Sequence, residues 1–199
     1  MRILQKNSGY IKGFTLIELL ITIAIVGIVV SIGVPSFTAT IRNSRLTTNI
    51  NELVTSLNIA RSEAIKRGQP VTVAKTDTEW EEGWNIFTDL NGDGGIDAGD
   101  GDTVLKLYKT LPIQYTLRAS GINRITYQPT GISGNGSFVL CDNSDSNNVP
   151  EAHTSRVVII NSVGRVRMGM DSDNNGIPEK DASGTMTNIT SCTTSPFTS

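Results

Sequence analysis

An apolar run near the N-terminus, GFTLIELLITIAIVGIVVSIGV (13–34), constrains this chain more than any other feature. As a helix it is long enough to cross a bilayer core of about 30 Å. The basic residues before it, Arg2, Lys6 and Lys12, would keep its N-terminal side in the cytoplasm by the positive-inside rule. A single carboxylate, Glu18, lies near its start, where a charge in the membrane should cost roughly 2.5–3.5 kcal/mol. Any interpretation of the chain has to explain that acid.

Two ordinary interpretations of this run leave something unexplained. A secretory signal peptide has a shorter apolar region and a small-x-small cleavage site, which Ser31-Ile32-Gly33 matches only weakly. A plain membrane anchor fits the length of the run but gives no reason for Glu18.

The longer stretch KGFTLIELLITIAIVGIVVSIGVPSF (12–37) resembles the class III signal of type IV pilins and pseudopilins. The resemblance implies that a prepilin peptidase cuts a short basic leader between Gly13 and Phe14 and methylates the new amine. It also implies that Glu18 pairs with the Phe14 amine of a neighbouring subunit in the filament. Such a pair offsets the desolvation cost of both charges. Pro35 falls where pilins often carry a helix-bending proline.

A second apolar pattern continues the helix past the membrane-length run. Residues at spacings of four and three form one stripe on a helix: Leu46, Ile50, Leu53, Leu57, Ala60 and Ala64. Gly68 predicts a C-terminal cap, and Pro70 forbids continuation soon after. The stripe could form a coiled-coil seam, but we expect it to pack under a sheet. The segment ARSEAIKRGQPV (60–71) resembles the end of this helix in the GspH/FimT group of minor pilins and pseudopilins.

After residue 70 the periodicity is that of short strands separated by Gly, Pro, Asn and Asp. The predicted strands are Val71–Lys75, Gly83–Thr88, Thr103–Lys109, Ile113–Arg118, Ile125–Gln128, Ser137–Cys141, Arg156–Asn161 and Val166–Met170. Eight such strands predict an antiparallel β-sandwich or folded sheet on the apolar stripe of the helix. The segment EWEEGWNIFTD (79–89) again resembles a GspH/FimT stretch.

We therefore predict an α+β fold, in which a long N-terminal α-helix packs on an antiparallel β-sheet or β-sandwich head. The predicted parts are a leader peptide (1–13), a transmembrane half of the helix (14–35), an amphipathic half (36–67) and a β-rich, GspH/FimT-like head (71–199).

The composition offers little for catalysis. The one histidine, His153, lies in a polar stretch, and two cysteines are too few for a His/Cys metal site. Without a nucleophile motif, a phosphate loop or paired carboxylates, we expect a protein that is not an enzyme. Beyond residue 13, fourteen basic residues stand against nineteen acidic ones, a net charge of −5. That balance argues against a generally basic, nucleic-acid-binding surface.

Cys141 and Cys192 are the only cysteines, so they allow one intrachain pairing. The expected topology places them outside the cytoplasm, where disulfides persist. A redox role would want a close Cys-x-x-Cys arrangement, which the sequence lacks. We expect a structural disulfide that closes a loop of about fifty residues.

The segment DLNGDGGIDAGD (89–100) has oxygen donors at the alternating positions of an EF-hand-type calcium loop. Its predicted ligands are Asp89, Asn91, Asp93, Asp97 and Asp100. An aspartate stands where a longer glutamate is usual, and the flanks read as strands. The alternative is an Asn/Asp/Gly-rich hairpin loop that binds no ion.

The segment DSDNNGIPEKD (171–181) has a similar start, at Asp171, Asp173, Asn175 and Gly176, but its later ligands fit poorly. No cofactor is certain from the sequence, and calcium is the one that these two segments suggest.

The motif GRVR (164–167) resembles the Gly-Arg-x-Arg motif of FimT-type minor pilins, which is linked to DNA binding during natural transformation. On a strand, Arg165 and Arg167 would project from one side about 6.6 Å apart, a separation that suits adjacent phosphates. Arg156 or Arg124 could add to this patch if the fold brought them near. The alternative is a strand turn, with the arginines paired to nearby aspartates.

We predict a minor pilin or pseudopilin, a structural subunit acting at the initiation or tip of a type IV pilus or related filament. The resemblance implies other major and minor pilins or pseudopilins, prepilin peptidase and the inner membrane as partners, with double-stranded DNA as a further one. It implies a single-pass protein of the bacterial inner membrane with a periplasmic head, assembled into a pilus or pseudopilus. The alternative is a type II secretion minor pseudopilin that acts in protein secretion without binding DNA.

Overall fold

The computed structural model describes residues 13–179 and 188–193. The chain divides into two compact units, Met1–Ile41 and Arg42–Ser199. The first holds the N-terminal part of a single long helix, and the second holds the rest of that helix together with the strands of the head.

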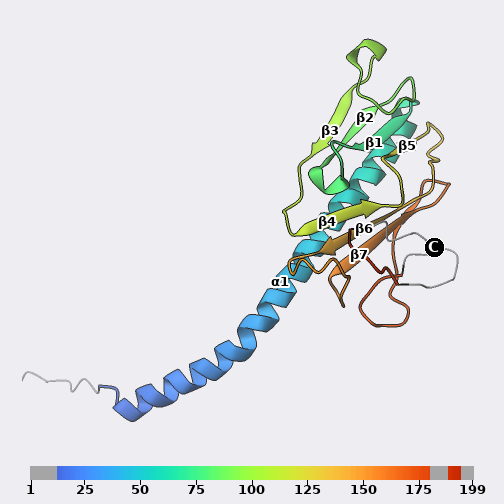
Figure 1. Cartoon of the computed structure of the whole chain (residues 1–199). Helices are drawn as coiled ribbons and strands as arrows, with labels where there is room; N and C mark the ends of the chain where they lie inside the picture. Colours follow the sequence, from blue (N-terminus) through green and yellow to red (C-terminus); the bar gives the residue numbers. More distant parts are fainter. Residues whose placement is uncertain (1–12, 180–187, 194–199) are drawn as a thin grey trace, which may run out of the picture. The chain divides into compact units, whose positions relative to one another are not determined.

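Helix α1 extends from Leu16 to Arg67 (Figure 1). Its first turn is capped by Thr15, whose hydroxyl accepts a hydrogen bond from the Glu18 N–H at 3.2 Å. Pro35 lies inside the helix. The helix ends where the sequence predicted, because Gly68 follows with a left-handed φ of +64°, which favours glycine.

The head contains two four-stranded sheets in which every neighbouring pair is antiparallel. The first sheet has the order β3-β2-β1-β5, with β1 at Val71–Lys75, β2 at Trp84–Thr88, β3 at Val104–Tyr108 and β5 at Arg124–Tyr127. The second has the order β4-β6-β7-β8, with β4 at Tyr115–Ala119, β6 at Gly136–Asp142, β7 at Ser155–Ile160 and β8 at Val166–Met168. Two short 3-10 turns, η1 (Trp80–Glu82) and η2 (Ala98–Asp100), complete the elements of the head.

All eight predicted strands are present, with ends displaced by at most two residues. The predicted α+β class is therefore confirmed, in its two-sheet form.

The main core lies between both sheets and the part of α1 that belongs to the second unit (Figure 1). The predicted stripe is confirmed, since its six members are all buried: Leu46, Ile50, Leu53, Leu57, Ala60 and Ala64. Trp80 and Phe138 meet edge to face in this core, with ring centroids 4.8 Å apart. Burial of this stripe against the sheets explains why the helix continues beyond its apolar run.

The two central strands of the second sheet, β6 and β7, are buried on both faces. Phe138, Leu140, Val158 and Ile160 face the main core. The alternate residues on the same two strands, Val139, Cys141, Val157 and Ile159, form an outer cluster with Ile189 and Cys192 of the C-terminal segment. The continuous apolar runs of β6 and β7, which do not alternate with polar residues, are the sequence signature of this double burial.

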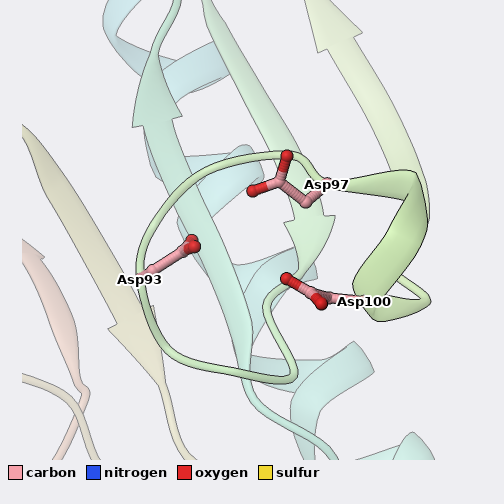
Figure 2. Close-up of side chains that lie close together, drawn as sticks. All are labelled: Asp93, Asp97 and Asp100. Carbon is pink, nitrogen blue, oxygen red and sulfur yellow. The ribbon is translucent and has the colours of Figure 1, made fainter.

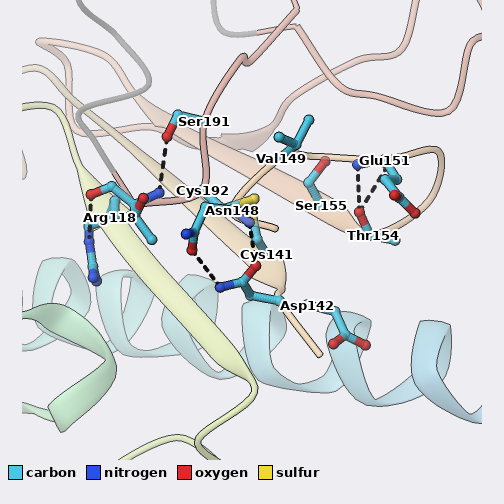
Figure 3. The surroundings of a disulfide bond; sticks show 12 residues. Arg118, Cys141, Asp142, Asn148, Val149, Glu151, Thr154, Ser155, Ser191 and Cys192 are labelled. Carbon is cyan, nitrogen blue, oxygen red and sulfur yellow. Dashed lines mark hydrogen bonds between the residues drawn. A yellow bond between two sulfur atoms is a disulfide. The ribbon is translucent and has the colours of Figure 1, made fainter. Parts of the chain in front are cut away.

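The predicted disulfide between Cys141 and Cys192 is present and lies in the outer cluster (Figure 3). It joins β6 to the C-terminal segment across a Cα–Cα distance of 5.7 Å. The Cys192 N–H also donates to the Asn148 carbonyl at 3.0 Å, so the segment is held by backbone contacts as well.

Candidate functional site: the N-terminal helix and the loops of the head

The N-terminal part of α1 presents apolar side chains on all its faces. The exposed large hydrophobic residues extend from Phe14, which is 80% exposed, to Ile41. The most apolar 18-residue window of the helix has a mean hydropathy of 2.6, and by length and composition α1 can cross a membrane. A helix that is apolar all round needs a surrounding apolar medium, either lipid or other helices.

Glu18 lies in the first turn of this helix and is exposed. The positive end of the helix dipole favours a carboxylate there, and the Thr15 cap holds the same turn. In the isolated subunit, the first turn of the helix therefore stabilises the Glu18 carboxylate. Our sequence interpretation missed Thr15, although Thr15 and Glu18 have the spacing of a capping box. Of the predicted leader, only Gly13 lies within the described residues.

The first acidic loop (89–100) brings three of its five predicted ligands together. Asp93, Asp97 and Asp100 each place a carboxylate oxygen within 4.8 Å of the others. Figure 2 shows all three carboxylates turned toward the inside of the loop. All three side chains are exposed. Grouped carboxylates in a loop with a glycine turn suit a hard cation such as calcium.

The other two predicted ligands make different contacts. The Asn91 amide donates to carboxylate oxygens of Asp93 and Asp100, both at 2.8 Å. Asp89 is fully buried and accepts a hydrogen bond from the Thr72 hydroxyl at 2.7 Å, so its carboxylate anchors the loop to β1. The five residues thus divide into a carboxylate group, a bridging amide and a buried anchor, and calcium binding at this loop stays a prediction.

Arg124 on β5 supports the first acidic loop. Its guanidinium donates to the Asp93 carbonyl, and a side chain at Gly94 would collide with it. The pKa of Asp93 lies below its usual range, chiefly because the Gly95 N–H donates to its carboxylate, with smaller contributions from Asn91 and Arg124. The loop is therefore arranged to keep Asp93 charged.

The GRVR motif covers the end of the turn between β7 and β8 and the start of β8. Arg165 lies in the turn rather than on the strand, since β8 begins at Val166. Its N–H donates to the Asn161 side chain at 2.9 Å, and its carbonyl accepts from the Asn161 N–H. Arg165 and Arg167 are both exposed, while Val166 between them packs on the main core.

Gly164 of the same motif has a structural role. Its φ is +74°, and a Cβ there would collide with the Gly131 carbonyl oxygen. Arg61 of α1 holds the same two loops, donating to the carbonyls of Gly131 at 2.9 Å and Val163 at 3.1 Å. The glycine is therefore needed for packing, whatever the two arginines bind.

The two arginines considered as helpers make contacts of their own. Arg124 serves the first acidic loop, as described above. Arg156 on β7 is half-buried and donates to the Asn43 side chain of α1, and burial lowers its pKa. Arg165 in the turn and Arg167 on β8 are both exposed, and Arg167 also interacts within the chain.

Two family profiles match this sequence. The profile described as "Type II transport protein GspH" matches residues 49–164, which is more than half of the chain. The profile described as "Prokaryotic N-terminal methylation motif" matches residues 10–34.

Curated relatives and solved structures are also similar. Two proteins from Pseudomonas aeruginosa, both called "Fimbrial protein", are 36% identical over 85 residues, which are 42% of this chain and 54% of each relative. The match thus spans about half the length of these relatives. The crystal structure of type IV minor pilin FimU from P. aeruginosa PAO1 has a TM-score of 0.52 at 22% identity, covering 64% of this chain and 90% of that one. The structure of the minor pseudopilin EpsH from the Type 2 Secretion System of Vibrio cholerae has a TM-score of 0.47 at 12% identity, covering 62% of this chain and 95% of that one.

Proposed function

Because this chain belongs to the GspH family, we propose that it is a minor pilin or pseudopilin, a structural subunit of a type IV pilus or related filament. One observation carries the proposal. The chain places a helix with exposed apolar faces directly after Gly13 and Phe14, with the lone acid Glu18 in its first turn. Such a surface suits a subunit that leaves the bilayer only by packing on other helices.

The proposal assigns a role to each part of the chain. Residues 1–13 are the leader, 14–35 the membrane-spanning half of the helix, 36–67 its amphipathic half and 71–199 the head. Prepilin peptidase, the inner membrane and other pilins or pseudopilins are the proposed partners. The head lies in the periplasm before assembly, and the chain acts at the initiation or tip of the filament.

Processing gives the first test. The mature protein, isolated from cells with prepilin peptidase, should begin at a methylated Phe14, as read by N-terminal sequencing and mass spectrometry. Gly13→Glu should leave the leader attached, and Gly9→Glu, the same change inside the leader, should not. A mature protein that begins at any other residue would contradict the proposal.

Assembly gives the second test. Glu18→Val should leave the protein in the membrane fraction but remove it from sheared filaments, because the register between neighbouring helices depends on the Glu18 charge. Thr22→Val is the matched control, since Thr22 is a polar residue of the same exposed helix, and its hydroxyl donates to the Leu19 carbonyl within that helix. Normal incorporation of the Glu18 variant would refute the assembly role.

We also propose that the head binds double-stranded DNA weakly through Arg165 and Arg167. Both residues are exposed, Arg165 in the turn and Arg167 two residues later on β8, which favours this role, although Arg167 also interacts within the chain. With two to four phosphate contacts, the slope of log affinity against log salt should be shallow, about −2 to −4. Binding should not depend on base sequence.

A mobility-shift titration at low and physiological salt tests this role. Arg165→Gln with Arg167→Gln should remove the shift. Lys106→Gln with Lys109→Gln is the control, because it deletes the same charge from exposed positions at β3, in the other sheet. If both double variants bind like the wild type, the turn is only structural.

The alternative is a minor pseudopilin of a type II secretion system, which the description of the GspH profile favours. The relatives named fimbrial proteins favour the pilus. Deletion of the gene separates the two, since loss of pili with normal secretion supports the pilus role and the reverse supports the secretion role.

A further inference from the structure

The second acidic loop (171–179), DSDNNGIPE, follows β8 and gathers three carboxylates. Asp171, Asp173 and Glu179 each place a carboxylate oxygen within 4.8 Å of the others. From the sequence, only the start of this loop matched a calcium loop. The fold brings Glu179, at the ninth position of the loop, back to the two aspartates.

Glu179 distinguishes this loop from the first acidic loop. Glu179 is buried, with only 4% of the residue exposed. One carboxylate oxygen, Oε1, accepts a hydrogen bond from the Ser172 N–H at 2.7 Å. The other, Oε2, is buried and has no hydrogen-bond partner among the described residues. A buried carboxylate oxygen without a donor is unfavourable unless a cation satisfies it.

The two aspartates are held in place by the backbone of the loop. Asp171 accepts from the N–H groups of Asn175 and Gly176, at 3.1 and 2.8 Å, and Asp173 also accepts from Asn175. Gly176 has a φ of +85° and its carbonyl accepts from the His153 N–H at 2.7 Å. A Cβ at Gly176 would lie 2.9 Å from Ala152, so glycine lets the loop rest on the neighbouring segment.

The ion pairs among the described residues use other carboxylates of the protein, those of Glu63, Glu79 and Glu81. The second acidic loop thus combines three converging carboxylates with one buried oxygen that lacks a donor. This combination points to a ligand rather than to a solvated turn.

We propose that the second acidic loop binds calcium through the carboxylates of Asp171, Asp173 and Glu179. Calcium takes six to eight oxygen ligands in flexible geometry, and the Asn175 amide oxygen and water can complete the set. The three carboxylates are hard oxygen donors without histidine or cysteine, which does not suit zinc. The site does not depend on the proposed filament role.

The ion would fix the C-terminal segment that covers the second sheet. Glu179 forms a β-bridge with Asn188, whose amide lies 3.5 Å from an Asp173 oxygen. Ile177 of the loop packs on the outer cluster, which also contains the disulfide. Calcium and the disulfide would thus both hold the C-terminal segment that packs on β6 and β7.

The full chain in detergent micelles, titrated with calcium chloride by calorimetry and melted in calcium or in chelator, tests the site. Calcium at about 100 times its Kd should raise the Tm by roughly 5–10 °C. Glu179→Gln and Asp173→Asn should each weaken binding at least tenfold. Glu151→Gln, at an exposed glutamate of the neighbouring segment, should leave calcium binding unchanged.

The melting temperature in chelator shows whether Glu179 is a calcium ligand or only a structural residue. In chelator, Glu179→Gln should melt no lower than the wild type, because it removes a buried charge and its new amide can donate to the two aspartates. In calcium the same variant should melt lower. If Glu179 has only a structural role, the difference in Tm between this variant and the wild type will be the same in calcium and in chelator, and that result would overturn the proposal.

Variants of the first acidic loop identify which loop responds. Asp93→Asn with Asp97→Asn should leave the calorimetric signal of the second acidic loop in place. The proposal is wrong if the wild type melts identically in calcium and chelator. It is also wrong if the calcium response survives both Glu179→Gln and Asp173→Asn in a protein that also carries Asp93→Asn with Asp97→Asn.

Discussion

The disulfide between Cys141 and Cys192 should carry a large part of the stability of the head. The bond closes a loop with a sequence separation of 51. In the chain-entropy model, a loop of that size restricts the unfolded chain by about 14 cal/mol/K, or about 4 kcal/mol at 25 °C. For a chain of this size, that loss corresponds to a fall in Tm of roughly 8–16 °C.

The perturbation is Cys141→Ala with Cys192→Ala, measured by calorimetry or circular dichroism on the full chain in detergent. The wild type in reductant is the control, because it keeps both sulfur atoms and loses only the cross-link. It should fall nearly as far as the double variant. The small difference between them measures the packing of the sulfur atoms in the outer cluster.

A fall of less than about 3 °C in both samples would refute the reasoning, since it would mean a loss of only about 1 kcal/mol. The backbone contact from Cys192 to Asn148 would then be enough to hold the segment. A large fall in the double variant alone would assign the effect to packing rather than to the cross-link.

Three further predictions concern the loops. Gly164→Ala should lower the free energy of unfolding by about 1–3 kcal/mol, because the φ of Gly164 is positive and the new Cβ would collide with the Gly131 carbonyl. A denaturant titration measures this loss, and an unchanged midpoint would contradict the prediction. The lowered pKa of Asp93 stabilises the head above the unfolded pKa of about 3.9, and this contribution is lost as the pH falls through the lower folded pKa. Asp93→Asn should therefore destabilise the head at pH 7 and have a shrinking effect below pH 4, as followed by melts across pH. If the first acidic loop also binds calcium, Asp93→Asn with Asp97→Asn should reduce the calorimetric stoichiometry by one ion, and an unchanged stoichiometry would leave the hairpin interpretation.

Much of the fold could be predicted from the sequence because its signals are local. The spacing from Leu46 to Ala64 determined which helix face is buried, and Gly68 and Pro70 determined where the helix ends. Strands followed from short apolar runs between turn residues. The resemblance to GspH/FimT minor pilins and pseudopilins is confirmed by the matching family profiles.

The parts that could not be predicted depend on contacts between distant segments. Asp89 is a predicted metal ligand, and the sequence did not indicate that strand pairing would bury it and bring it to Thr72, seventeen residues earlier. In the second acidic loop, Glu179 occupies the ninth position, as Asp97 does in the first acidic loop, but the twelfth position is Ala182, which has no carboxylate, so the later ligands fitted poorly in sequence. Arg61 illustrates the same limit, since nothing near it in sequence indicates the loops that it holds.

In the proposed filament, α1 is also the element through which a pulling force would enter the head. The buried stripe lies on one face of the helix, so a force along the helix axis loads its contacts in shear and all at once. Arg61 adds two hydrogen bonds that join the helix to separate loops of the head. We therefore expect the head to resist tension up to a threshold and then to separate from its helix in one event. Force spectroscopy on the single chain should record one rupture peak, and a gradual series of small extensions would contradict this picture.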